Sequence, residues 1–144
     1  MPVTVAPRTV LRVPVPADLT IDDPARQVLV ARLGARRTLW FAAEDLDLDY
    51  AADPLEVDVT SEAGGYAVRV TARFLARDIV VHADRLDPDA VVDDAVVTLL
   101  AGESRTFHVV TSSTLDAASL GSGPVLVTVN DSVVATRALS VRVE

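Results

Sequence analysis

The chain has 144 residues, of which 50% are hydrophobic and only 4% aromatic, and its formal net charge is −8. This acidic balance argues against nucleic-acid binding, which depends on basic patches that neutralise phosphates. The absence of cysteine excludes disulfides and thiolate metal sites. Valine is abundant, and β-branched residues fit a pleated sheet better than a helix, so the composition favours an all-β chain.

The first fifty residues contain three or four short strand-like segments. Residues 8–15 roughly alternate apolar and polar side chains, and residues 27–33 and 38–42 are two further apolar runs separated by a turn. Three strands with one apolar face cannot close a sandwich by themselves. We therefore expect residues 1–52 to be the closing strands of a preceding Ig-like β domain that is only partly present. They would pack on the following domain, pair with another chain or complete a domain that begins upstream.

The remaining residues predict a complete sandwich. A Gly64-Gly65 turn separates two alternating segments, residues 55–61 and 66–75, which we expect to pair as a hairpin. Residues 114–120 are the only stretch that favours a helical turn. Further strands are expected at 79–81, 95–100, 106–110, 125–129, 133–135 and 139–143. Short strands at this spacing are typical of an antiparallel, immunoglobulin-like β-sandwich, here over residues 53–144.

Four local patterns occur in an order that resembles a known family. They are the run Leu-Trp-Phe-Ala-Ala-Glu-Asp-Leu-Asp-Leu at 39–48, Val-Thr-Ala at 70–72 followed by Arg77-Asp78, Ala-Asp-Arg-Leu-Asp-Pro at 83–88, and Leu-Leu-Ala-Gly-Glu at 99–103. Together they resemble the C-terminal immunoglobulin-like region of bacterial β-mannosidases of glycoside hydrolase family 2. The resemblance is strongest over residues 38–110.

The resemblance implies a chain without catalytic or cofactor-binding residues. In that family two Glu residues on a separate (β/α)-barrel carry out hydrolysis with retention. This chain lacks the strand–helix alternation of a barrel, and none of its Glu residues follows an Asn, as the family's acid/base does. The expected function is a non-catalytic accessory segment of a β-mannosidase-like hydrolase whose full-length form releases terminal β-D-mannose.

The expected partner is the remainder of that glycosidase, and the exposed N-terminal strands could also mediate a homo-oligomer. An alternative function, from a different class, is a free-standing β-sandwich module that binds carbohydrate or protein. The two functions differ in whether the reading frame continues upstream into a barrel.

One acidic run matches the spacing of a calcium-binding loop. The side chains at positions 1, 3, 5, 9 and 12 of that loop would be Asp45, Asp47, Asp49, Asp53 and Glu56. Position 6, which normally needs glycine, is Tyr50. The alternation of Leu with Asp is explained equally by a strand with one solvated face.

Aromatic and amide residues provide two further hypotheses. Trp40 and Phe41 are adjacent, so on a strand one side chain would point inward and the other outward, where it could contact a sugar or a neighbouring domain. Asn130 begins an Asn-Asp-Ser triplet that fits a glycosylation acceptor, but we interpret it as a hairpin turn because Asn tolerates left-handed backbone. A metal site at the two histidines, His82 and His108, would lack further nitrogen or sulfur ligands.

The sequence contains no stretch of about 20 apolar residues that would span a membrane. Residues 1–15 have prolines and arginines where a secretory signal needs an unbroken apolar run. The compartment stays open on this evidence, with the cytoplasm favoured.

Overall fold

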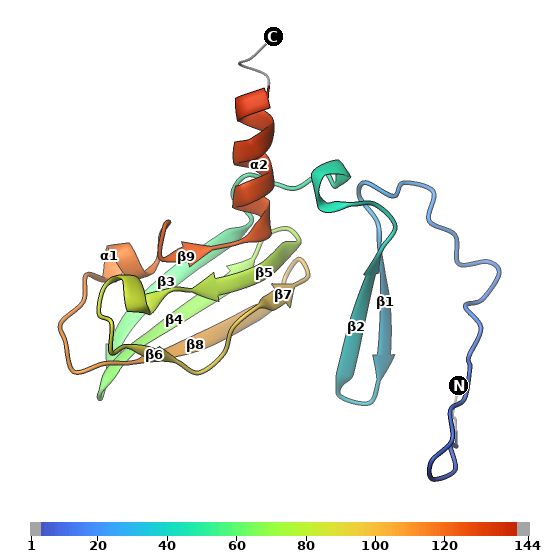
Figure 1. The fold of residues 1–144 in the computed structure, drawn as a ribbon, viewed down its shortest axis with the longest axis horizontal. Coiled ribbons are helices and arrows are strands. Elements are labelled where there is room, and N and C mark those ends of the chain that lie inside the picture. Colours follow the sequence, from blue (N-terminus) through green and yellow to red (C-terminus); the bar gives the residue numbers. More distant parts are fainter. Residues whose placement is uncertain (1–3, 141–144) are drawn as a thin grey trace. The chain divides into compact units, whose positions relative to one another are not determined.

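The computed structural model describes residues 4–140, and these divide between Glu44 and Asp45 into two compact units. In the first unit, β1 (Val28–Leu33) and β2 (Arg36–Phe41) form an antiparallel hairpin in which Val28 pairs with Phe41 (Figure 1). The two strands confirm the predictions for residues 27–33 and 38–42. Gly34 makes the turn with a positive φ of 58°, a conformation that glycine adopts without steric cost.

The predicted strand at residues 8–15 is wrong. Residues 4–20 are all exposed, and none of them belongs to a strand or helix. Alternation alone does not make a strand, because backbone groups need a neighbouring strand to pair with. Pro14 and Pro16 also remove two backbone donors from this stretch.

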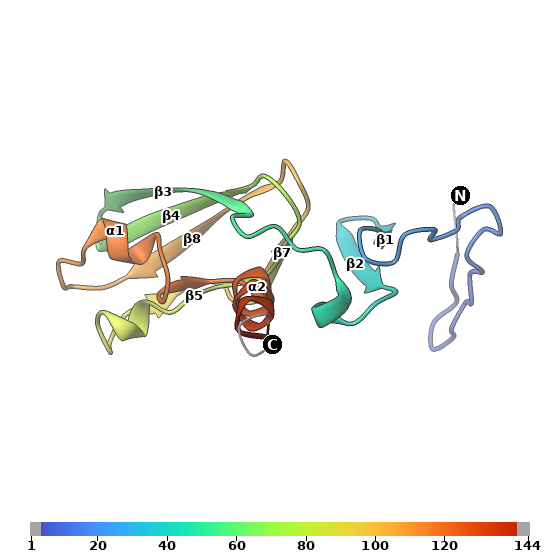
Figure 2. The same cartoon turned by 90° about the horizontal axis from the view of Figure 1, so that it is seen from above.

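The second unit is an antiparallel sandwich of two sheets, which confirms the predicted immunoglobulin-like fold class. One sheet has the order β3 (Leu55–Glu62), β4 (Gly65–Ala72), β8 (Ser104–Val110) and β6 (Val91–Val92). The other has the order β7 (Val97–Leu99), β5 (Ala76–Val81) and β9 (Leu126–Val127). Seen from above, the β3–β4–β8 sheet and the layer that contains β5 lie on opposite sides of the core (Figure 2).

Alternating burial along β4 and β8 builds the core of this sandwich. Tyr66, Val68 and Val70 point inward from β4, while Arg69 between them is exposed. Phe107 and Val109 are likewise buried on β8, and Ile79 of β5 belongs to the same buried core. Each fully buried side chain of this kind contributes about 1.5–3 kcal/mol to the free energy of folding. The period-2 pattern in the sequence is therefore the direct cause of the two-layer structure.

The hairpin between β3 and β4 confirms the predicted Gly64-Gly65 turn. Gly64 has a φ of 83°, and Gly65 lies at the start of β4 against Val109 of β8. A Cβ atom at position 65 would stand 1.8 Å from the Val109 carbonyl oxygen. The close approach of β4 and β8 thus requires glycine at this point.

The C-terminal strand predictions are largely wrong. Only β9 forms within residues 125–129, and the helix α2 (Val129–Ser140) replaces the strand expected at 133–135 and the start of the one expected at 139–143. Positions 141–143 lie outside the described residues. Thr128 and Asp131 form a capping box, with the Asp131 N–H donating to Thr128 Oγ1 at 3.2 Å and the Thr128 N–H to Asp131 Oδ2 at 2.8 Å. This cap opposes the strand preference of the valines that follow.

Short helical turns complete the second unit. They are η1 (Asp45–Asp47), η2 (Ala83–Arg85) and α1 (Ala117–Leu120). The last confirms the helical turn expected within residues 114–120, and its N-cap Asp116 accepts a hydrogen bond from the Ser119 N–H. Among the described residues, no helix is long and apolar enough to cross a membrane.

Candidate functional site

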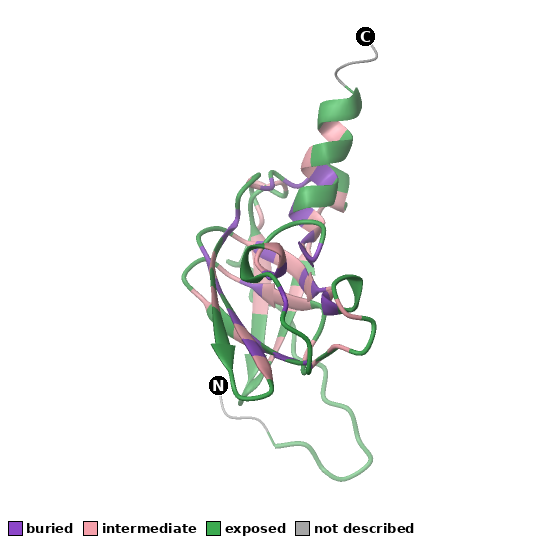
Figure 3. Ribbon diagram, turned by 90° about the vertical axis from the view of Figure 1, so that its left-hand side faces the viewer, coloured by how far each residue is buried: buried purple, intermediate pink, exposed green. Residues whose placement is uncertain are grey.

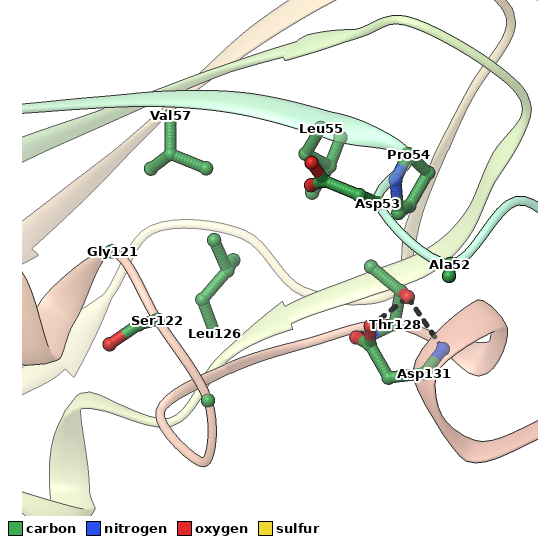
Figure 4. Close-up of a pocket in the computed structure, with 11 residues that line it drawn as sticks. Ala52, Asp53, Pro54, Leu55, Val57, Gly121, Ser122, Leu126, Thr128 and Asp131 are labelled. Atoms are coloured by element: carbon green, nitrogen blue, oxygen red, sulfur yellow. Dashed lines mark hydrogen bonds between the residues drawn. The ribbon is translucent and has the colours of Figure 1, made fainter. Parts of the chain in front are cut away.

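A cleft of about 160 Å³ lies between the beginning of β3 and the turn that leads through β9 into α2 (Figure 4). Its walls include apolar side chains of both sheets and four polar residues. The lining residues are Ala52, Asp53, Pro54, Leu55, Val57, Gly121, Ser122, Gly123, Leu126, Thr128 and Asp131. The fold brings them together because β3 and β9 lie at corresponding edges of the two sheets.

The polar groups of this cleft are engaged in structural contacts. Asp131 Oδ2 accepts hydrogen bonds from the backbone N–H and the hydroxyl of Thr128, both at 2.8 Å. Asp53 Oδ2 accepts from Arg73 Nη2 at 2.9 Å. The Ser122 hydroxyl donates to the Ala118 carbonyl at 2.7 Å. The cleft therefore presents a capped helix, a surface ion pair and a hydroxyl bonded to a backbone carbonyl, and its one hydroxyl–carboxylate contact, Thr128 with Asp131, belongs to the cap of α2.

The carboxylates of the calcium hypothesis serve separate contacts. Asp45 lies in η1, beside Arg77 and Tyr50, whereas Asp53 pairs with Arg73. The remaining members of the run, Asp47, Asp49 and Glu56, are exposed. Within residues 4–140 no group of three or more His, Asp or Glu side chains is arranged to hold a metal ion. The strand with one solvated face that was the alternative explanation does not form, because Asp45–Asp47 is a tight helical turn.

Asp45, Tyr50 and Arg77 form a hydrogen-bonded group at the start of the second unit. The Tyr50 hydroxyl donates to Asp45 Oδ1 at 2.9 Å, and Arg77 Nη1 donates to the same oxygen and, at 3.3 Å, to the Tyr50 hydroxyl. Burial raises the pKa of Tyr50 to about 12, with Arg77 opposing the rise and Asp45 adding to it. The hydroxyl therefore stays protonated at neutral pH and acts as a donor.

Trp40 and Phe41 lie on opposite faces of β2, as expected for neighbours on a strand. The Trp40 side chain is 56% exposed, and Phe41 is half-buried. Within the first unit, Trp40 lines an apolar hollow of about 510 Å³ together with Val15, Leu19, Ile21 and Leu29. Apolar side chains of β1, β2 and the segment before β1 therefore line this hollow.

His108 lies on the solvent face of the larger sheet, where its Nδ1 is 2.8 Å from Glu62 Oε1. The hydrogen bond that the protonated His108 ring donates to the Glu62 carboxylate and, after it, the negative charge of that carboxylate raise the pKa of His108. The Nδ1 atom of His82 lies 3.9 Å from Oδ1 of Asp84. The two histidines thus have separate carboxylate neighbours.

Asn130 is the main polar residue whose role the sequence did not reveal. It belongs to the first turn of α2, not to a hairpin, and its side chain is fully buried. The side chain donates to the Leu75 carbonyl at 2.9 Å and accepts from the Arg77 N–H at 3.0 Å. A buried amide with these partners has no space for a glycan, so this triplet is not a glycosylation site in the folded chain. The Thr-x-x-Asp spacing of residues 128–131 was the signal for the helix.

A comparison with protein families finds one match. The model of Ig_mannosidase, described as an Ig-fold domain, matches residues 51–132, which is more than half of the chain. The matched range contains both sheets of the sandwich and the first turn of α2. A search of curated proteins found no match to the chain.

Proposed function

Because the chain belongs to the Ig_mannosidase family of Ig-fold domains, we propose that it is a non-catalytic accessory segment of a β-mannosidase-like glycoside hydrolase. The family match over residues 51–132 carries this proposal. The parent enzyme would be a bacterial member of glycoside hydrolase family 2 that releases terminal β-D-mannose with retention of configuration. The ordered motifs between residues 39 and 103 support this finer assignment.

The chemistry of the sandwich supports a structural role. A retaining glycosidase needs two carboxyl groups about 5–5.5 Å apart across the scissile bond. In the cleft of Figure 4, the carboxylate of Asp131 caps α2 and that of Asp53 pairs with Arg73. Both groups stabilise the sandwich itself, which fits a domain that supports an active site located elsewhere in the parent enzyme.

The first unit supplies the expected contact with the parent. Its exposed apolar side chains include Val10, at 90% exposure, Leu11, Val13, Val15 and Leu19. Two of them, Val15 and Leu19, share the apolar hollow beside Trp40, and apolar surface that is clustered in this way is typical of an interaction site. We interpret residues 1–52 as the closing part of a preceding Ig-like β domain, whose other strands would cover these side chains and the hollow beside Trp40.

A free-standing carbohydrate-binding module is the second candidate. It is favoured by one observation, the exposed Trp40 ring above an apolar hollow, because aromatic rings stack on the apolar faces of sugars. The accessory role is preferred because the same hollow also suits burial by a neighbouring β domain.

Two measurements test the accessory proposal. The coding DNA upstream of Met1 should continue in frame into a (β/α)-barrel with a glutamate pair. Assays of the 144-residue chain with an aryl β-mannoside should show no turnover above buffer. Turnover by the chain alone would overturn the proposal, as would an upstream stop codon directly before Met1.

A further inference from the structure

The segment from Asp45 to Pro54, which leads into β3, is held by side chains that come from much later in the chain. Over residues 45–53 its backbone–backbone hydrogen bonds are short-range, from Leu48 N to Asp45 O at 3.3 Å and from Tyr50 N to Leu48 O at 2.9 Å, and only at Pro54 does a carbonyl accept from distant backbone N–H groups, those of Arg73 and Phe74. Such bonds stabilise a single turn only weakly, because one or two hydrogen bonds do not offset the conformational entropy lost when the backbone of the turn is ordered. Yet Leu48 and Tyr50 are buried, with exposures of 3% and 7%.

Arg137 of α2 fixes the η1 turn. Its Nη2 donates to the carbonyls of Leu46 and Leu48, at 2.6 and 2.8 Å. The Leu48 carbonyl also accepts from the Tyr50 N–H, so Arg137 is a second donor to that oxygen. One charged donor therefore connects both carbonyls to α2.

Asn130, about two turns before Arg137 in α2, fixes the other end of the segment. Its Nδ2 lies 3.4 Å from the Ala51 carbonyl and 2.9 Å from the Leu75 carbonyl. Its Oδ1 accepts from the backbone N–H of Arg77. One fully buried amide thus joins α2, the start of β5 and the segment.

Arg77 completes the arrangement from β5. Its guanidinium pairs with the Asp45 carboxylate and contacts the Tyr50 hydroxyl. The side chain is about a quarter exposed, so the pair is less screened than a surface ion pair. Asp45, the first residue of the second unit, is therefore anchored to the sandwich by a charge-assisted hydrogen bond.

We propose that Arg77, Asn130 and Arg137 form a clasp that couples the order of residues 45–52 to the packing of α2. The helix then has a function beyond closing the end of the sandwich. Figure 3 shows that α2 buries residues at its base and exposes its outer turns, so its packed surface is small. A small change in the docking of α2 would loosen the connection that leads from the first unit into the sandwich. The clasp does not depend on the identity of the parent enzyme.

Hydrogen–deuterium exchange of the 144-residue chain tests the coupling. Arg137→Ala removes the two hydrogen bonds to the Leu46 and Leu48 carbonyls while leaving the core unchanged, since Arg137 is only half-buried. We expect amides of residues 46–52 to exchange about tenfold faster, with β4 and β8 unaffected. Arg69→Ala is the matched control, because Arg69 lies on the exposed face of β4 and should leave the segment protected.

A second variant tests the other end of the clasp. Asn130→Asp keeps the acceptor for the Arg77 N–H but loses the donor to Leu75 and Ala51. We expect faster exchange in the same segment, together with faster exchange in α2. Unchanged exchange of residues 46–52 in Arg137→Ala would overturn the proposal. An equal increase throughout β4 and β8 would overturn it as well, because it would indicate general destabilisation.

Discussion

The Tyr66 hydroxyl makes two hydrogen bonds with the backbone of Leu115. It accepts a hydrogen bond from the Leu115 N–H at 2.7 Å and donates to the Leu115 carbonyl at 3.0 Å. The two residues are 49 positions apart, and both are buried. One phenol oxygen thereby ties the loop before α1 to the central strand β4, as a structural anchor within the sandwich core.

Removing this hydroxyl should destabilise the second unit. Tyr66→Phe leaves a buried N–H and a buried carbonyl of Leu115 without their partner, which costs about 1–3 kcal/mol in the free energy of unfolding. Urea denaturation followed by far-UV circular dichroism would measure the loss. Thr71→Val on the solvent face of β4 is the control and should change stability by less than about 0.5 kcal/mol. Equal stability of Tyr66→Phe and the parent chain would contradict the assigned role of this anchor.

The capping box should be needed for α2. Thr128→Ala removes the hydroxyl that accepts from the Asp131 N–H, and we expect a loss of about 1 kcal/mol together with reduced helical circular dichroism. Thr136→Ala provides the control, because the Thr136 hydroxyl bonds only to the Ser132 carbonyl of its own helix. A Thr128→Ala variant with full helix content and stability would show that tertiary contacts alone hold α2.

The His108–Glu62 pair should make stability depend on pH. Because Glu62 raises the folded-state pKa of His108, the stabilisation is fully present below the unfolded value of about 6.5 and is lost as pH rises through the raised pKa. Glu62→Gln should shift the NMR titration of His108 toward 6.5. Glu56→Gln, on the same strand but opposite Thr71, should leave that titration unchanged. A His108 titration that is identical in the parent chain and Glu62→Gln would disprove the coupling.

Trp40 distinguishes the accessory role from the binding module. If the chain is an accessory segment, insoluble mannan should retain neither the parent chain nor Trp40→Ala. If it is a module, mannan should retain the parent chain, and Trp40→Ala should lose that binding. Phe74→Ala is a suitable control, since Phe74 is also 56% exposed but belongs to the second unit. If Trp40→Ala still bound mannan as the parent chain does, Trp40 would not be the sugar-binding residue, and the accessory role would also be contradicted.

Much of the sandwich was predictable from the sequence. Alternation along residues 55–61, 66–75 and 106–110 specifies which side chains face the core, because a strand places successive side chains on opposite faces. The Gly64-Gly65 pair specified the turn between the first two of these strands. These are local properties, and they predict three of the four strands of the larger sheet, whereas the edge strand β6 was not predicted.

The positions of the acidic side chains were less predictable, because the carboxylates of Asp45 and Asp53 pair with arginines that are distant in the sequence. The regular spacing of Asp45, Asp47 and Asp53 suggested one cation site, but Arg77 and Arg73 bind two of these residues separately. The contacts of a charged side chain depend on which opposite charge the fold places beside it. The spacing of residues in the sequence does not give that neighbour.

The valine-rich alternation and the glycine turn were by themselves enough to determine that this chain forms an antiparallel sandwich, since burial of one face per strand follows from period 2. Only the tertiary structure decided that residues 8–15 pair with no other strand and that residues 129–140 form a helix. For the helix, the valines favour a strand, but the Thr128 cap and the buried contacts of Asn130 with Leu75 and Arg77 favour α2. Those contacts join residues more than fifty positions apart, and they exist only once the sandwich has formed.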